Sequence, residues 1–132
     1  MTDVVDPRPP ESNHERIILI TGATNGIGKE VAIELLAKGH HVILHGRNPK
    51  KVEKVVSEAL NRVLDAKIDT ILADFSSLEA IKGMAEELNA RFSLLDVLIN
   101  NAGVYYNKRC YSADGFELAF AVNYLTSFAL TF

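Results

Sequence analysis

The sequence predicts an α/β fold in which helices cover both faces of a parallel sheet. Short apolar runs alternate four times with segments whose apolar residues recur at helical spacing. The runs are rich in Val, Ile and Leu, as expected of parallel strands that are buried on both faces. A glycine cluster joins the first apolar run to the first helical segment. These observations favour a doubly wound α/β domain over an all-α or all-β fold.

The first half of the chain supplies two strand–helix units. The first strand is expected over residues 16–20 (RIILI) and its helix over residues 26–38. The second strand is expected over residues 41–45 (HVILH). Its helix begins at Pro49, a residue that is tolerated in the first turn, and ends near Arg62.

Two more units follow. The third strand is expected over residues 67–73 (KIDTILA), and either Ser76 or Ser77 caps the next helix. The fourth strand is expected over residues 95–99 (LDVLI). Right-handed crossovers between these strands give the predicted sheet order 3-2-1-4.

The last helix is expected to begin after a capping box formed by Asp114 and Glu117. It reaches Phe132 without a glycine, a basic last turn or a proline. The fourth strand would also be an exposed apolar edge, which is an aggregation hazard. We therefore expect the chain to be truncated on that side of the sheet, before a further strand and helix.

Composition limits the classes of function. The net charge of −3 argues against a general nucleic-acid surface, and no apolar run approaches the roughly 20 residues that span a bilayer. The single cysteine, Cys110, forms no disulfide within the chain, which fits a reducing, cytoplasmic setting. Residues 1–14 are acidic and proline-rich and are predicted to be a flexible tail, which leaves residues 15–132 as the domain.

The glycine cluster has the features of an anion site. A strand that enters a glycine loop and then a helix directs backbone N–H groups and the positive helix end to one place. Gly22 permits the tight turn, Gly26 lets a pyrophosphate approach, and Gly28 allows close packing of helix and strand. Thr24 and Asn25 add short polar side chains. An ordinary glycine turn is the alternative explanation.

The end of the second strand indicates which dinucleotide is preferred. A cofactor with a free ribose 2′-hydroxyl usually meets an acidic residue about 20 residues after the loop. Gly46 occupies that position here and Arg47 follows it. A guanidinium in place of a carboxylate favours a 2′-phosphate, and hence NADP, although Arg47 could also be a simple surface arginine.

Four motifs in this order resemble those of the short-chain dehydrogenases/reductases. They are TGATNGIG at residues 21–28, Asp74 with Phe75 after the third strand, NNAG at residues 100–103, and Asn123 in the last helix. The resemblance runs from about residue 16 to the end of the chain. It implies a Rossmann-type fold, and it is strongest to the retinol- and steroid-type branch.

The resemblance implies a role for each matching residue. The pyrophosphate would face Asn25, Gly26, Ile27 and Gly28, and the 2′-phosphate would meet Arg47 with Asn48. The adenine would meet Asp74 and Phe75, and the ribose would meet Asn101, Ala102 and Gly103. Asn123 would hold, through its backbone, a water of a proton relay. Taken singly, the Asn and Asp residues could equally be turn or cap residues.

The family's catalytic pair, a tyrosine with a lysine four positions later, is not found after any of the four tyrosines. The resemblance thus implies the NADP-binding part of an oxidoreductase that acts on a small carbonyl or alcohol substrate, with no turnover by this chain alone and a homo-oligomer for the complete protein. The alternative is a non-catalytic module that binds nucleotides or proteins. No metal site is expected, because His40 and His41 point to opposite faces of a strand and lack acidic or thiol partners.

Overall fold

The computed structural model describes residues 14–132, so the predicted tail lies outside the described residues except for His14. Four parallel strands form one sheet in the order β3-β2-β1-β4, which confirms the predicted topology. The elements are β1 (Ile17–Ile20), α1 (Gly26–Ala37), β2 (His41–Gly46), α2 (Pro49–Arg62), β3 (Lys67–Leu72), α3 (Leu78–Arg91), β4 (Val97–Ile99), α4 (Leu118–Phe120), η1 (Ala121–Leu125) and α5 (Thr126–Thr131). Among the described helices, none has the length and apolar character that crossing a membrane requires.

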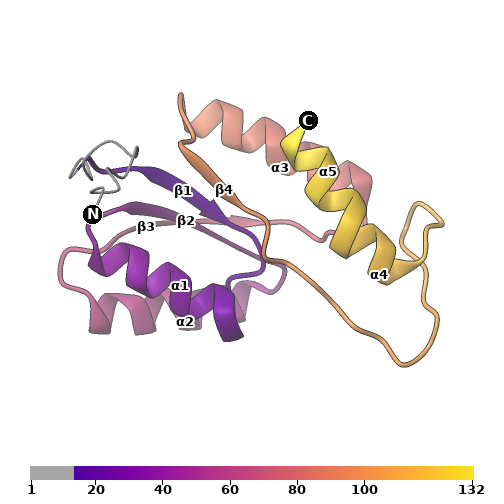
Figure 1. Ribbon diagram of the computed structural model, residues 1–132, viewed down its shortest axis with the longest axis horizontal. Coiled ribbons are helices and arrows are strands. Elements are labelled where there is room, and N and C mark those ends of the chain that lie inside the picture. Colours follow the sequence, from indigo (N-terminus) through magenta and orange to yellow (C-terminus); the bar gives the residue numbers. More distant parts are fainter. Residues whose placement is uncertain (1–13) are drawn as a thin grey trace, which may run out of the picture.

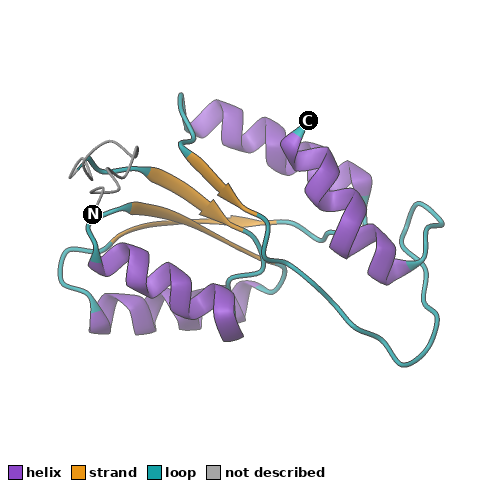
Figure 2. Ribbon diagram, in the orientation of Figure 1, coloured by secondary structure: helices purple, strands orange, loops and turns teal. Residues whose placement is uncertain are grey.

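The sheet separates two helical layers (Figures 1 and 2). Helices α1 and α2 cover one face, and α3 with the α4–η1–α5 segment covers the other. A long loop leaves β4 and returns to α4 beyond the carboxyl ends of the strands. Helices therefore lie on both faces of the sheet, as the alternating pattern predicted.

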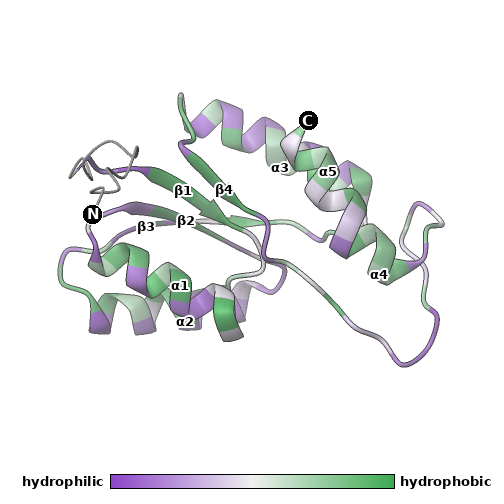
Figure 3. Cartoon of the chain, in the orientation of Figure 1, coloured by the Kyte–Doolittle hydropathy of each residue, from purple (hydrophilic) through white to green (hydrophobic). Residues whose placement is uncertain are grey.

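Alternation along the strands divides the core between the two layers. Ile18 and Ile20 point toward α1 and α2, whereas Leu19 points toward α3. Parallel pairing brings Leu19 beside Ile43 on β2, so apolar side chains meet across strands on both faces. Figure 3 shows β1 and β4 as apolar along their length, whereas Lys67 and Asp69 make β3 more polar. The two central strands, β1 and β2, are the ones that are largely buried, as expected of strands covered on both faces.

Caps mark the ends of the first three helices. Gly39 follows α1 with a φ of +85°, the left-handed conformation of a helix C-terminal glycine. The side chain of Asn48 caps α2, and that of Ser77, not Ser76, caps α3. The fourth strand is shorter than predicted and begins at Val97.

The predicted capping box at Asp114 and Glu117 is wrong. Asp114 Oδ2 instead accepts the backbone N–H of Leu78 at 2.8 Å, at the start of α3. Glu117 is itself the N-cap residue of α4, and its carboxylate accepts N–H groups within α4. The residues before it fold back in a turn in which Phe116 O accepts the N–H of Ser112 at 2.7 Å, so the helix begins only at residue 118.

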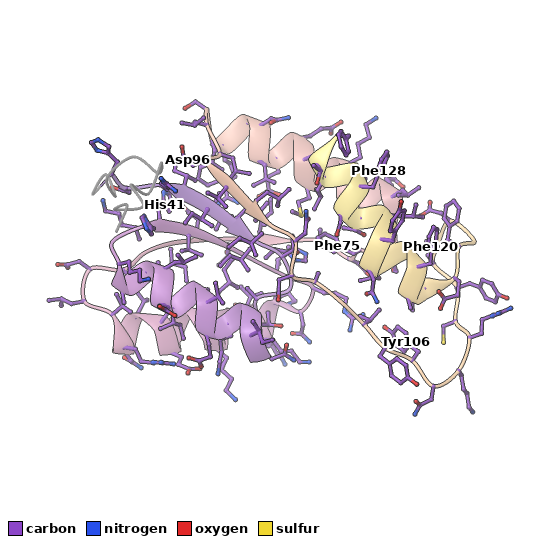
Figure 4. The ribbon with its side chains drawn as sticks, viewed as in Figure 1. His41, Phe75, Asp96, Tyr106, Phe120 and Phe128 are labelled. Carbon is purple, nitrogen blue, oxygen red and sulfur yellow. The ribbon has the colours of Figure 1, made fainter. Side chains whose placement is uncertain are left out.

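The α4–η1–α5 segment exposes aromatic side chains at intervals of four residues. Phe120 stacks on Tyr124 with ring centroids 5.3 Å apart, and Phe128 lies 5.2 Å from Phe132. All four rings are exposed, and Figure 4 labels Phe120 and Phe128 on this segment. Residues four apart share one helical face, so the segment presents an apolar ridge.

Candidate functional site

The loop between β1 and α1 and the first turn of α1 each require one glycine for steric reasons. Gly22 has a φ of +62°, and a Cβ atom there would lie 2.7 Å from Cα of Ala102. A Cβ atom at Gly28 would lie 2.3 Å from Nδ2 of Asn101. These distances are too short for non-bonded atoms, so the two glycines let the loop pack directly against the chain that follows β4.

The first turn of α1 presents backbone N–H groups at the surface of this loop. Asn25 is the N-cap residue, but its side chain makes no capping hydrogen bond. Gly26 has a φ of +55°, and no atom lies within 4 Å of the position that its Cβ would take. The first N–H groups of a helix lack partners within the helix and carry the positive end of its dipole. This open end of α1 can therefore hold an anion such as a phosphate.

Two polar side chains fasten the glycine loop to the end of β4. The hydroxyl oxygen of Thr21 accepts the N–H groups of Asn101 and Ala102, both at 3.0 Å. The side-chain amide of Asn101 donates to the carbonyl oxygens of Thr21 and Gly22, each at 3.1 Å. Thr21 is buried, so its hydrogen bonds are shielded from water. Asn101 thus has a bracing role in addition to any contact with a ligand.

His45, at the end of β2, joins the site although the sequence did not predict it there. Its Nδ1 accepts the N–H of Gly22 at 3.0 Å, and its Nε2 lies 3.0 Å from the carbonyl oxygen of Ala73. Its ring stacks on Phe75 with centroids 4.1 Å apart and planes 4° from parallel. Burial lowers the pKa of His45, against a smaller opposing effect of the bond to Ala73. A neutral imidazole therefore connects three separate segments of the site.

The position after His45 leaves no room for an acidic side chain. A Cβ atom at Gly46 would lie 2.5 Å from Cγ2 of Val52 and 2.6 Å from Cγ2 of Thr24. Arg47 follows, and Lys51 lies in the first turn of α2; both side chains are exposed and both line the same cleft. The end of β2 therefore presents two cations and no carboxylate.

Asn48, which was predicted to assist Arg47, has a different role in the structure. Its Oδ1 accepts the backbone N–H groups of Lys50 at 3.0 Å and Lys51 at 3.3 Å. It does not line the cleft. The cap holds the first turn of α2, so Asn48 acts on the cleft indirectly by positioning Lys51.

Asp74, after β3, is held as a carboxylate in a tight turn. Its Oδ1 accepts the backbone N–H of Ser76 at 2.9 Å. This bond holds the pKa of Asp74 below its usual value against the opposing effect of partial burial, and the Ser76 hydroxyl and the charge of Arg47 lower it further. The carboxylate remains an acceptor for a donor group of a ligand.

These groups line one cleft of about 380 Å³ at the carboxyl ends of the strands. Figure 4 shows Phe75 near the end of the sheet and Tyr106 on the long loop after β4. The predicted residues that line the cleft are Gly22, Thr24, Asn25, Gly26, Ile27, Arg47, Asp74, Phe75, Asn101, Ala102 and Gly103. Residues that were not predicted also line it, namely His45, Lys51, Ala73, Ser76, Val104, Tyr106, Leu118 and Val122.

Asn123 and Gly28 lie outside this lining. The side chain of Asn123 brackets Val104: Oδ1 accepts its N–H at 2.7 Å, and Nδ2 donates to its carbonyl at 2.9 Å. Asn123 lies in η1, where both the N–H and the hydroxyl of Thr126 bond to the carbonyl oxygen of Ala121. Such π-helical turns are frequent at functional sites. The side chain positions the loop after β4, and the backbone role in a proton relay stays a prediction.

A comparison with protein-family models identifies the family: the short chain dehydrogenase model matches residues 16–132. The chain belongs to the short-chain dehydrogenase family. Human polyprenol dehydrogenase is 38% identical over 128 residues, which cover 97% of this chain and 37% of that protein. Human retinol dehydrogenase 13 is 35% identical over 116 residues, 88% of this chain and 35% of that protein. The predicted family is confirmed, and retinol dehydrogenases are among its relatives.

Solved structures agree with the fold. A metagenomic short-chain oxidoreductase in complex with NADP has a TM-score of 0.76 and 28% identity, over 90% of this chain and 55% of that chain. The NADP complex of RhlG from Pseudomonas aeruginosa has a TM-score of 0.73 and 28% identity, over 87% of this chain and 44% of that chain. The chain thus spans little more than a third of the curated relatives and about half of these structures.

Proposed function

We propose that this short-chain dehydrogenase chain is the NADP-binding part of an oxidoreductase that transfers hydride between the nicotinamide and a small carbonyl or alcohol substrate. The observation that carries the proposal is the end of β2, where Arg47 and Lys51 line the cleft and where Gly46 has no space for a side chain. An acidic side chain would repel a 2′-phosphate, and here packing excludes one.

The glycine loop and the first turn of α1 would hold the pyrophosphate. Their backbone N–H groups include those of Asn25, Gly26, Ile27 and Gly28, and the last of these contributes through packing rather than through the cleft surface. Ile27 is 78% exposed although it is apolar, which fits a side chain that a bound ligand would cover. The site fits a dinucleotide because glycine is required where the backbone must approach both the ligand and Asn101.

The remaining groups of the cleft would orient the two ends of the cofactor. The Asp74 carboxylate, beside Phe75, would accept a hydrogen bond from the adenine amino group. Ala102 and Gly103 would lie along the ribose. The bound cofactor would supply the hydride. Asn123 would keep the chain after β4 in place through Val104 and would hold a water through its backbone.

The substrate assignment rests on the relatives. They carry the names polyprenol dehydrogenase and retinol dehydrogenase 13, both of which name an alcohol. A tyrosine–lysine pair outside these 132 residues would then supply the acid–base chemistry. We also propose a cytoplasmic setting, on the single cysteine, and a homo-oligomer, on the exposed aromatic ridge of α4–η1–α5.

The test is a calorimetric titration of NADP⁺ and NAD⁺ into the natural protein that contains these residues. NADP⁺ should bind at least about tenfold more tightly, because hydrogen bonds to a charged group contribute about 1.5–3 kcal/mol. Arg47→Ala should remove most of that preference and leave NAD⁺ binding within about twofold, because NAD⁺ has no 2′-phosphate.

Lysine variants test whether Lys51 is the second cation that binds the 2′-phosphate. Lys51→Ala should weaken NADP⁺ binding about threefold or more, because one charge near a phosphate is lost. Lys50→Ala is the matched control, since Lys50 is exposed in the same turn but does not line the cleft. Equal affinity of the wild-type protein for the two dinucleotides would contradict the proposed preference.

A further inference from the structure

The His45 imidazole is the only ionisable side chain lining the cleft that is buried, and it links both walls of the cleft. On one side it accepts the N–H of Gly22, the residue at which the glycine loop turns. On the other side it bonds to the carbonyl of Ala73 and stacks on Phe75. Displacement of this ring would therefore move both the pyrophosphate loop and the adenine wall.

The hydrogen bonds define one tautomer of His45. A backbone N–H donates to Nδ1, so Nδ1 carries no proton. A carbonyl oxygen only accepts, so Nε2 carries the proton and donates it to Ala73. A second proton on Nδ1 would place two N–H groups opposite each other at the Gly22 contact. That bond would be lost, and a charge would lie in a buried position.

We propose that His45 is a positioning residue for the dinucleotide, which holds the glycine loop and the adenine wall together only as its neutral Nε2–H tautomer. Acid therefore weakens dinucleotide binding through a group that does not itself contact the phosphates. The inference rests on the proposed function, because it concerns the same cofactor cleft.

The surroundings of His45 favour the neutral form. The charged residues that line the cleft are Arg47 and Lys51, from the β2–α2 side, and Asp74, from the end of β3; the loops after β1 and β4 add none to that lining. Burial lowers the pKa of His45, and no charged group contributes to the shift. The protonated form is therefore reached only at a lower pH than for an ordinary histidine.

The opposite sign of the effect is also physically reasonable, which makes the proposal testable. An imidazolium near a pyrophosphate would attract it, so a histidine that acted as a cationic ligand would bind the dinucleotide more tightly in acid. A positioning histidine gives weaker binding in acid. The direction of the pH dependence separates the two roles.

The experiment is an NADP⁺ titration between pH 5 and pH 8 on the natural protein that contains these residues, with His45→Asn beside it. Asparagine can still accept the N–H of Gly22 but does not titrate. The 2′-phosphate of the ligand also titrates near pH 6, and this affects both proteins equally. The ratio of their dissociation constants therefore reports His45 alone.

We expect the wild-type affinity to fall between pH 7.5 and pH 5 by about fivefold more than that of His45→Asn, the equivalent of one lost hydrogen bond. The control is His14→Gln, which replaces an exposed histidine that does not line the cleft. It should follow the wild-type curve, and it controls for the general loss of a histidine charge. Parallel curves for the wild type and His45→Asn, or tighter wild-type binding in acid, would overturn the proposal.

A measurement on the wild-type protein covers the case in which His45→Asn does not fold. Nitrogen NMR of ¹⁵N-histidine-labelled protein should show the Nε2–H tautomer, and NADP⁺ should shift the midpoint of the His45 titration to lower pH. An Nδ1–H tautomer, or a midpoint that NADP⁺ leaves unchanged, would refute the inference alone. Absence of NADP⁺ binding at every pH would refute the proposed function as well.

Discussion

The two faces of the sheet are packed to different degrees. Toward α1 and α2, core side chains such as Leu36 and Leu44 are almost completely buried. Toward α3 and α5, Leu19 and Ile43 are buried, but Leu98 and Leu130 are only partly covered. Two pairs of neighbouring aromatic rings also lie exposed along α4–η1–α5, a segment that Figure 3 colours partly apolar.

The cleft lies across this difference, so its two walls are not equally supported. The glycine loop, Arg47 and Lys51 precede or belong to α1 and α2, the closed layer. Val104 and Leu118 come from the long loop and the open layer. The phosphate-binding wall is thus built against the more completely buried core, whereas part of the opposite wall is held by the two hydrogen bonds between Asn123 and Val104.

The largest expected effect compares leucines from the two layers. Leu36→Ala in α1 should lower the free energy of unfolding by about 2–5 kcal/mol, because it leaves a cavity in a closed core. Leu130→Ala in α5 should cost about 1 kcal/mol or less, because part of that side chain is already in water. Urea unfolding of both variants measures the difference. Equal losses would show that the open layer is covered in solution.

Glycine substitutions give the next largest effect. Gly22→Ala should cost about 1–3 kcal/mol, because an L-residue is strained at a φ of +62° and its Cβ would meet the backbone of Ala102. Gly83→Ala is the control, since α3 has open space there, and it should stabilise the protein by about 0.5–1 kcal/mol. Thermal unfolding compares them. A Gly22→Ala variant as stable as the wild type would disprove the close packing of loop and β4.

The sheet order and most elements could be predicted because their signals are local. The RIILI run indicates a strand, and Gly39 indicates the end of a helix, from only a few neighbouring residues. Three of the four family motifs were also local, since each follows directly on a strand end. Two of the residues so predicted, Arg47 and Asp74, line the cleft.

The failures involve partners far apart in the chain. Asp114 suggested a helix cap for its own neighbours, but it bonds to the N–H of Leu78, 36 residues away. His45 was not predicted to join the site, because its partners Gly22 and Ala73 are each more than 20 residues distant.

The smallest expected effect concerns the less supported wall. Asn123→Ala removes both bonds to Val104 and should cost about 0.5–1.5 kcal/mol, since water can replace exposed partners. Hydrogen exchange should become faster at residues 103–106 and stay unchanged in α1. Uniformly faster exchange in both layers would show that the two walls are not independent.

The most direct test of the central claim is the hydrogen-exchange footprint of NADP⁺ on the natural protein that contains these residues. The account predicts slower exchange in four segments that meet at the cleft, residues 22–28, 46–51, 74–76 and 101–104, with little change in α3 and α5. Protection confined to the exposed aromatic segment, or no protection at saturating NADP⁺, would contradict the assignment of this cleft as the dinucleotide site.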